Sequence, residues 1–292
     1  MNFRTDLALE RHEILNKSDL SGVLTETEEE ENIRISRMTI KSREAEKKLL
    51  KPKGRYITLE IPSFLNDAEI FDNKLNLLSK EISSVLPSEN GEVLVVGLGN
   101  EQITADALGP KTSSLILATR HISSEIASSL GFDKLRSVAS LAPGVLGRTG
   151  IETGEIIRGI TDRIKPQAVI VVDALASRSI KRLGTTVQIS DTGICPGSGV
   201  GNNRKRLDET TLGVKVISIG VPTVVDGETL VYDLTDRKKT KSFSALPESK
   251  NVVVTPKEID LLIDRASKLI SMAINCALQK DMTPEDIISL VS

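Results

Sequence analysis

Apolar residues along the chain fall into short continuous runs, separated by stretches in which they recur at helical spacing. The run VLVV at residues 93–96 leads into Gly97-Leu98-Gly99, which predicts a buried strand that ends in a tight turn. A helix is expected to begin near Pro110, because proline suits the first turn of a helix. Further buried strands are predicted at 168–172 and 214–220, where β-branched residues dominate.

Helical periodicity marks three other segments: residues 75–86, 154–164 and 259–277. The last follows Thr255-Pro256-Lys257-Glu258, which is typical of a helix N-cap with a capping box. The helix near Pro110 is expected to run on toward His121. The helix at 154–164 lies between strand candidates at 137–141 and 168–172, so the three form a β-α-β unit that favours parallel pairing.

Residues 55–61 alternate well enough for a half-buried strand, and residues 187–190 are another strand candidate. Together these elements predict a three-layer α/β fold, with a mainly parallel central sheet and helices on both faces. We expect one domain over residues 55–292. Residues 1–54 are polar, with an acidic run at 26–31, and are expected to form a solvated or partly disordered N-terminal region.

Composition narrows the classes of function. Aromatic residues make up 2% of the 292 residues and tryptophan is absent, which removes the platforms on which single-stranded nucleic acid stacks. A net charge of −2 argues against direct binding of nucleic acid. Cys195 and Cys276 are expected to be free thiols in a reducing cytoplasm, and no apolar run approaches the roughly 20 residues of a membrane span.

Two aspartates accompany the predicted strands. Asp106 lies in the segment after the strand at 93–97, and Asp173 directly follows the run at 168–172. The carboxyl ends of parallel strands meet at one edge of a sheet, so the two side chains could share a crevice. Neighbouring carboxylates do not both ionise readily, so such a pair can act as base and acid in one reaction. The alternative for each aspartate is a helix cap after a strand.

Two loops are candidates for contact with a ligand. The first contains Gly97, Gly99 and Asn100, and the second contains Gly197 and Gly199. Glycine lets a loop approach a peptide backbone closely or present amides to an oxyanion, whereas the structural alternative is a surface turn. Asp191-Thr192-Gly193 has the letters of the pepsin-like active-site triplet, but those proteases are all-β and need two triplets, so this one receives no catalytic role.

A non-catalytic phosphate- or nucleotide-binding module is an alternative to an enzyme with an aspartate pair, since Gly97-Leu98-Gly99 follows a strand. The third glycine of the dinucleotide fingerprint is missing, because Glu101 and Gln102 occupy the next positions. A Walker-type Gly-Lys-Ser/Thr is absent from the sequence as well.

Several long motifs, in matching order, resemble the germination protease (spore protease) of spore-forming bacteria. These motifs are GLGN…DALGP (97–110), LAPGVLGRTGIET (141–153), VVDALASRSI (171–180), ISDTGICPGSGVGNNRK (189–205) and IGVPTVVD (219–226). The family also begins like RTDLALE at residues 4–10, so the resemblance covers nearly the whole chain.

The resemblance implies an endopeptidase that begins the degradation of small acid-soluble spore proteins during germination. Asp106 and Asp173 match the family's proposed catalytic aspartates, which implies an aspartic-type pair that activates water. It also implies a zymogen that removes its own short N-terminal segment, residues 1–6, by cutting between Asp6 and Leu7. A homotetramer in the cytoplasm of the forespore and spore core is expected, without cofactor or metal and without direct contact to nucleic acid or membrane.

The motif Gly-x-Gly-Asn with a later strand-end aspartate is also similar to the hydrogenase-maturation endopeptidases, which use nickel in substrate recognition. This similarity implies a phosphorylase/hydrolase-like, hydrogenase-maturation-protease-like sheet, and it keeps a metal-linked maturation endopeptidase as an alternative. Those enzymes add a histidine that neither His12 nor His121 matches well.

Overall fold

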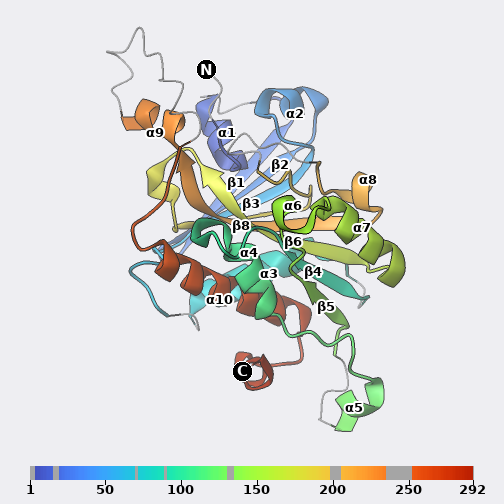
Figure 1. The fold of residues 1–292 in the computed structure, drawn as a ribbon. Coiled ribbons are helices and arrows are strands. Elements are labelled where there is room, and N and C mark those ends of the chain that lie inside the picture. Colours follow the sequence, from blue (N-terminus) through green and yellow to red (C-terminus); the bar gives the residue numbers. More distant parts are fainter. Residues whose placement is uncertain are drawn as a thin grey trace.

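The computed structural model describes residues 4–15, 20–69, 72–88, 91–129, 135–197, 205–234 and 252–291. Within these ranges the strands form one sheet in the order β1-β2-β3-β7-β8-β6-β4-β5, and a short strand β9 (Val253–Val254) pairs with β8 (Figure 1). Helices cover both faces of this sheet, so the predicted three-layer α/β architecture is confirmed.

Four strands form the parallel part of the sheet: β5 (Val138–Leu141), β4 (Val93–Gly97), β6 (Ala168–Ser177) and β8 (Lys215–Asp226). Alternate residues of β4 enter different cores, because Val93 and Val95 pack in one cluster while Leu94 and Val96 pack in another. A strand buried on both faces needs apolar residues throughout, which explains the continuous run VLVV.

The other part of the sheet is antiparallel. β7 (Thr186–Ser190), β3 (Gly54–Glu60), β2 (Ile33–Ile40) and β1 (Val23–Glu30) follow β8 in that order. The strand predictions at 55–61 and 187–190 are therefore confirmed as β3 and β7. The parallel prediction holds for the four strands that carry the candidate site.

The expectation of a solvated N-terminal region is wrong for residues 33–49. β2 pairs with β3 along its length, so the sheet runs across the predicted boundary at residue 54. Ile33 and Ile35 of β2 enter the large core, while Met38 and Ile40 pack under two N-terminal helices, α1 (Ala8–Ile14) and α2 (Arg43–Leu49). All of the acidic run except Glu31 lies in β1, an edge strand that is largely exposed.

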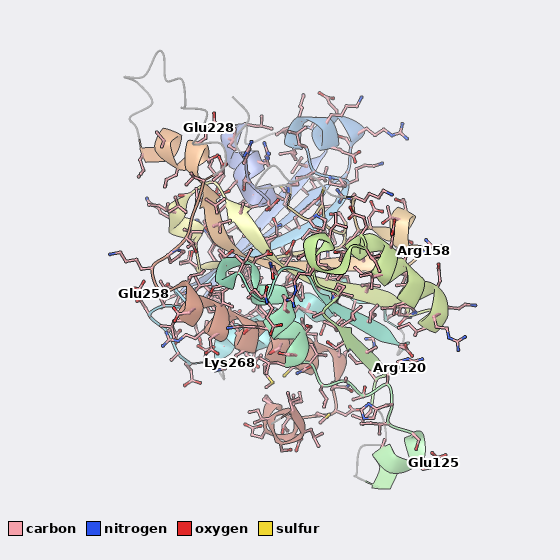
Figure 2. All side chains as sticks on the ribbon, in the orientation of Figure 1. Arg120, Glu125, Arg158, Glu228, Glu258 and Lys268 are labelled. Atoms are coloured by element: carbon pink, nitrogen blue, oxygen red, sulfur yellow. The ribbon has the colours of Figure 1, made fainter. Side chains whose placement is uncertain are left out.

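One face of the sheet is covered by α3 (Asn73–Val85), η1 (Thr104–Asp106), α4 (Leu108–Ser114) and α10 (Ile259–Leu278). The other face carries α7 (Thr153–Ile164) and α8 (Glu209–Leu212), beside α1 and α2. The remaining elements are α5 (Ser124–Ser129), α6 (Leu146–Thr149), η2 (Ile180–Arg182), α9 (Gly227–Leu234) and α11 (Pro284–Val291). Charged side chains such as Lys268 lie on the outer face of α10, while Arg158 of α7 reaches α8, where it donates to Thr211 O at 3.0 Å (Figure 2).

Two helix boundaries differ from the prediction. α4 ends at Ser114 and does not reach His121, because the Asn275 side chain accepts from Leu117 N (3.0 Å) and donates to Leu115 O (3.1 Å). These bonds replace the backbone pairs that a continued helix would need. α10 begins at Ile259 without a side-chain cap, so the capping box predicted at residues 255–258 is wrong. The Thr255 hydroxyl instead donates to Thr223 O at 2.9 Å.

Candidate active site

Asp106 is held by the tight loop that follows β4. The backbone N–H of Asn100 donates to Asp106 Oδ2 at 2.7 Å, which fixes the carboxylate against the loop. Gly99 has φ +117°, and a Cβ atom added there would lie 2.0 Å from Asp106 O. Only glycine fits this combination of positive φ and close approach. The predicted loop residues Gly99 and Asn100 therefore shape the surroundings of Asp106.

Gly97 and Gly109 allow α4 to pack directly on the end of β4. A Cβ at Gly97 would lie 2.0 Å from Gly109 O, and one at Gly109 would lie 2.2 Å from Leu98 O. Leu98 N donates to Val172 O at 2.8 Å, which ties this turn to the strand that carries the second aspartate. Gly97 thus acts through packing, and Gly109 is a contributor that the sequence analysis did not single out.

Asp173 is buried within β6, beyond the point where its partner β4 ends. The predicted strand stopped at residue 172, but β6 continues to Ser177 because β8 goes on pairing with it as far as Ser177↔Val225. Asp173 and Asp106 line one cavity of about 310 Å³, together with Gly99 and Gly197. The structure therefore brings both predicted aspartates to the same cavity. Gly199 lies outside the described residues.

The N-terminal segment enters the same cavity through Asp6. Asp6 pairs with Ala176 of β6, because Asp6 N donates to Ala176 O and Ala176 N donates to Asp6 Oδ2, both at 2.9 Å. The acidic side chain is therefore bound by a main-chain amide three residues beyond Asp173. The sequence carried no sign of the role of Ala176, since its contribution is made by the backbone.

Residues on both sides of Asp6 are fixed as well. Leu7 and Ala8 are fully buried. Arg4 Nη1 forms an ion pair of 3.0 Å with the buried carboxylate of Asp226. Segment 4–8 is thus seated by side-chain burial and by polar contacts along its length.

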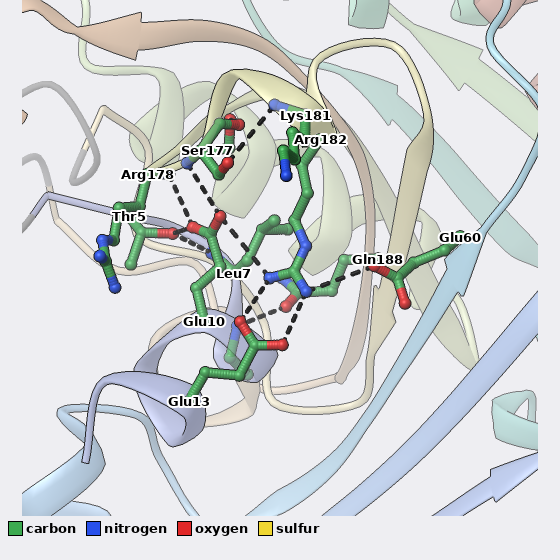
Figure 3. Close-up of polar contacts among 12 residues, drawn as sticks. Thr5, Leu7, Glu10, Glu13, Glu60, Ser177, Arg178, Lys181, Arg182 and Gln188 are labelled. Atoms are coloured by element: carbon green, nitrogen blue, oxygen red, sulfur yellow. Dashed lines mark hydrogen bonds and ion pairs between the residues drawn. The ribbon is translucent and has the colours of Figure 1, made fainter. Parts of the chain in front are cut away.

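A buried carboxylate, Glu10, organises the contacts beneath this segment (Figure 3). Glu10 accepts from Arg178 N at 2.6 Å and Ser179 N at 3.1 Å, and it also accepts a hydrogen bond from the Thr5 hydroxyl. Leu7 N in turn donates to Thr5 Oγ1 at 3.0 Å, so Thr5 bridges Leu7 and Glu10. Glu10 therefore connects the N-terminal segment to the end of β6.

A second, larger cavity of about 910 Å³ adjoins the first, and both include Asp6 and Leu175 in their walls. Four basic residues line it: Arg4, Arg11, Lys51 and Arg206. Lys51 Nζ donates to Asp6 O at 2.7 Å. Burial lowers the pKa of the Lys51 ammonium, while the charge of Asp6 acts in the opposite direction. The sequence analysis missed Lys51.

The remaining aspartates near strand ends have structural roles. Asp191 Oδ1 accepts from Arg55 N at 2.7 Å, which joins the end of β7 to β3. Asp226 accepts from Thr229 N and Thr229 Oγ1 at 3.1 and 3.0 Å, besides its ion pair with Arg4. Neither aspartate lines the cavity of the aspartate pair. The Asp-Thr-Gly triplet at 191–193 thus lies outside this cavity.

Within the described ranges, three or more His, Cys, Asp or Glu side chains nowhere gather in an arrangement suited to a metal ion. A search of the same residues finds no helix with the length and apolar character that crossing a membrane requires.

Comparison with known proteins identifies the family. The sequence model of the germination protease family matches residues 4–239. A germination protease of Caldanaerobacter subterraneus subsp. tengcongensis is 43% identical, with 100% of this chain and 98% of the relative covered. Germination proteases of Clostridium perfringens and Bacillus pumilus are 40% and 36% identical, over 98% and 97% of this chain and 98% and 95% of their own.

Among solved structures, a NiFe hydrogenase maturation protease of Thermococcus kodakarensis aligns with 68% of this chain and 98% of its own, at 20% identity and a TM-score of 0.39. The sequence relatives, in contrast, match along nearly the full length of both proteins. The chain belongs to the germination protease family and is a peptidase.

Proposed function

We propose that the protein is an endopeptidase that begins the degradation of small acid-soluble spore proteins during germination, and that it is made as a zymogen which cuts its own Asp6–Leu7 bond. One observation carries this proposal: Asp6 lines the same cavity as Asp106 and Asp173. An acidic residue followed by a large apolar residue and alanine is the substrate pattern implied by the family resemblance, and Asp6-Leu7-Ala8 has that pattern.

Asp106 and Asp173 would divide the proton transfers of peptide hydrolysis. The ionised member takes a proton from water as the water attacks the carbonyl carbon, and the protonated member supplies a proton to the reacting peptide. Collapse of the tetrahedral intermediate then breaks the C–N bond and releases a carboxylate and an amine. The roles of the individual aspartates stay open.

The seating of the N-terminal segment supports the zymogen part of the proposal. Asp6 is bound to Ala176 through its main chain and side chain, and Arg4 is paired with Asp226. A spore protein would need the same binding site, so the segment blocks its entry until the Asp6–Leu7 bond is cut. Removal of residues 1–6 would leave this binding site open.

The protein would act as an oligomer, in the compartment where its substrates lie. A homotetramer in the cytoplasm of the forespore and spore core fits a protease whose substrates coat spore DNA. The protein's net charge of −2 supports contact with the spore proteins themselves and not with the nucleic acid.

The proposal is tested with Asp106→Asn and Asp173→Asn, which keep the size of each side chain but remove its proton chemistry. Purified wild type should cut a small acid-soluble spore protein after acidic residues and should remove its own residues 1–6, as read by mass spectrometry. Both variants should be folded and at least 100-fold slower in each reaction, on the order expected for loss of an acid–base group.

Asp162→Asn is the matched control, because Asp162 lies on the outer face of α7 with 59% of its side chain exposed. It should cut like wild type. Near-normal cleavage by Asp106→Asn or Asp173→Asn would instead show that the altered aspartate is structural.

A further inference from the structure

The carbonyl oxygen of Asp6 accepts two hydrogen bonds from side chains. Lys51 Nζ donates at 2.7 Å and Gln188 Nε2 donates at 3.2 Å. This oxygen belongs to the Asp6–Leu7 peptide, the bond that the proposed function has the enzyme cut. A charged donor and an amide donor on one peptide oxygen are the elements of a site that stabilises an oxyanion.

Gln188 is oriented by a contact on the far side of the same bond. Its Oε1 accepts from Ala8 N at 2.7 Å, so its amino group is the end that remains for Asp6 O. The side chain is buried, and it projects from β7, a strand inside the sheet. Gln188 therefore spans the Asp6–Leu7 bond and fixes the peptide at two points from a rigid element.

Lys51 is delivered by the end of α2. Leu50 adopts a left-handed conformation with φ +54°, which ends the helix and turns the chain, and Lys51 N then donates to Glu46 O at 3.3 Å. The ammonium reaches into the basic cavity and donates to a main-chain oxygen there. A partly desolvated cation interacts strongly with charge that develops on its acceptor.

We propose that Lys51 is a catalytic residue of this peptidase, and that with Gln188 it stabilises the oxyanion formed on the carbonyl oxygen of the cut bond. The assignment rests on the proposed function. Asp6 lies where the two cavities meet, with the aspartate pair lining one and Lys51 and Gln188 lining the other. The carbonyl oxygen thus has hydrogen-bond donors other than the aspartates. The aspartate pair can then take the proton from water and give one to the leaving nitrogen.

Water adds to the Asp6 carbonyl carbon and gives one proton to the ionised aspartate, while the C=O electron pair moves to the oxygen held by Lys51 and Gln188. These electrons re-form the C=O bond as the C–N bond breaks, and the leaving nitrogen takes a proton from the protonated aspartate. Lys51 keeps its proton throughout.

Self-cleavage of the full-length chain tests the assignment, because the cut segment is already bound and the rate reports the chemical step. Lys51→Met should cut its Asp6–Leu7 bond about 100- to 1000-fold more slowly than wild type, the range for loss of an oxyanion donor. Gln188→Leu should also be slowed. Lys48→Met, at an exposed position of the same helix, should cut like wild type.

Lys51→Arg separates a catalytic charge from a structural one. The wild-type rate should fall as the pH rises through the lowered pKa of Lys51, because the neutral amine loses its charge–oxyanion interaction. Arginine stays protonated, so Lys51→Arg should retain cleavage without that alkaline decline. The groups that act on Lys51 from neighbouring elements are Asp6, Arg11, Cys195 and Arg206.

Two results would overturn the assignment in different ways. Normal self-cleavage by Lys51→Met, or an alkaline decline unchanged in Lys51→Arg, would remove Lys51 from catalysis and leave the proposed function intact. Wild-type chain that never cuts between Asp6 and Leu7 would overturn the processing site, and the role of Lys51 with it. The melting temperature of each variant shows whether a loss of rate comes from unfolding.

Discussion

Two glycines of this chain should respond in opposite ways to replacement by alanine. Gly99 combines φ +117° with a backbone oxygen only 2.0 Å from an added Cβ, whereas Gly159 lies in the middle of α7 with open space around it. Gly99→Ala must therefore displace the loop that presents Asp106, while Gly159→Ala removes only a flexible residue from a helix.

We expect Gly99→Ala to lower the free energy of unfolding by more than about 1 kcal/mol and to abolish peptide cleavage, because strain and a backbone clash act together. Gly159→Ala should raise the free energy by about 1 kcal/mol and leave cleavage unchanged. Urea unfolding and a cleavage assay measure both. Wild-type activity in Gly99→Ala would contradict the account of this loop.

At the same scale, the sequence was sufficient to find the residues whose position follows from strand order. Asp106 and Asp173 could be paired in advance because both follow predicted parallel strands. Lys51 and Gln188 could not be found this way. Lys51 lies in a basic cluster that is usual for a solvated surface, and Gln188 lies in an ordinary strand. Their contacts with residue 6 cross 45 and 182 positions of sequence.

Among the elements, the central strands were the most predictable and the edge strand β1 the least. β4 and β6 are buried on both faces, so their composition alone identifies them. β1 is exposed along nearly its whole length and is rich in glutamate, which resembles a solvated segment. Charge on an edge strand prevents its pairing with strands of other chains. The glutamates that protect β1 in this way also make its sequence look like that of a solvated segment.

Helix boundaries were missed where distant side chains decide them. Asn275 of α10 ends α4 through bonds to Leu115 and Leu117, a contact that no local pattern contains. Thr255 was expected to cap α10, but its hydroxyl bonds the backbone of β8. Capping signals are local, and tertiary hydrogen bonds override them.

One ion pair joins the antiparallel part of the sheet to a helix of the main core. Arg37 of β2 donates from Nε to Glu81 Oε1 of α3 at 3.1 Å, and Glu81 is 3% exposed. This bond raises the pKa of the Arg37 guanidinium, with a smaller contribution from Glu28. Loss of Arg37 would leave a carboxylate buried without its cation.

Arg37→Ala should therefore destabilise the fold by roughly 1–3 kcal/mol, the usual cost of a buried polar group that loses its partner. The midpoint of urea unfolding measures the effect. Arg34→Ala, at an exposed position of the same strand, is the control and should change the midpoint little. Equal midpoints for the two variants would show that the Arg37–Glu81 pair contributes nothing.

At the scale of the whole molecule, cleavage should change the contacts that join the N-terminal segment to the sheet. Thr5 bridges Leu7 N and the buried Glu10 carboxylate in the intact chain. Cleavage after Asp6 would remove Thr5 and leave a free ammonium on Leu7 close to Glu10, where opposite charges would pair.

Glu10→Gln should consequently lower the melting temperature of the cleaved chain more than that of the uncleaved chain, because only the cleaved chain contains the ammonium. Asp173→Asn supplies the uncleaved background, and thermal unfolding measures all four forms. Glu13→Gln, with half of its side chain exposed, serves as the control. Equal losses in the two backgrounds would contradict pairing between Leu7 and Glu10.

The burial of Lys51 has a final consequence for how a substrate is chosen. Burial is the larger of two opposing effects on the pKa of Lys51, and the charge of Asp6 acts against it. A substrate with a neutral residue in place of Asp6 would bury the amine without that opposing charge, so the pKa of Lys51 should be lower in this complex than beside an acidic residue. Substrate binding and proton binding are then thermodynamically linked, and the linkage differs between the two kinds of substrate. Calorimetry of the mature form in buffers of different ionisation enthalpy should detect this as a greater release of protons when a neutral peptide binds than when the matching acidic peptide binds.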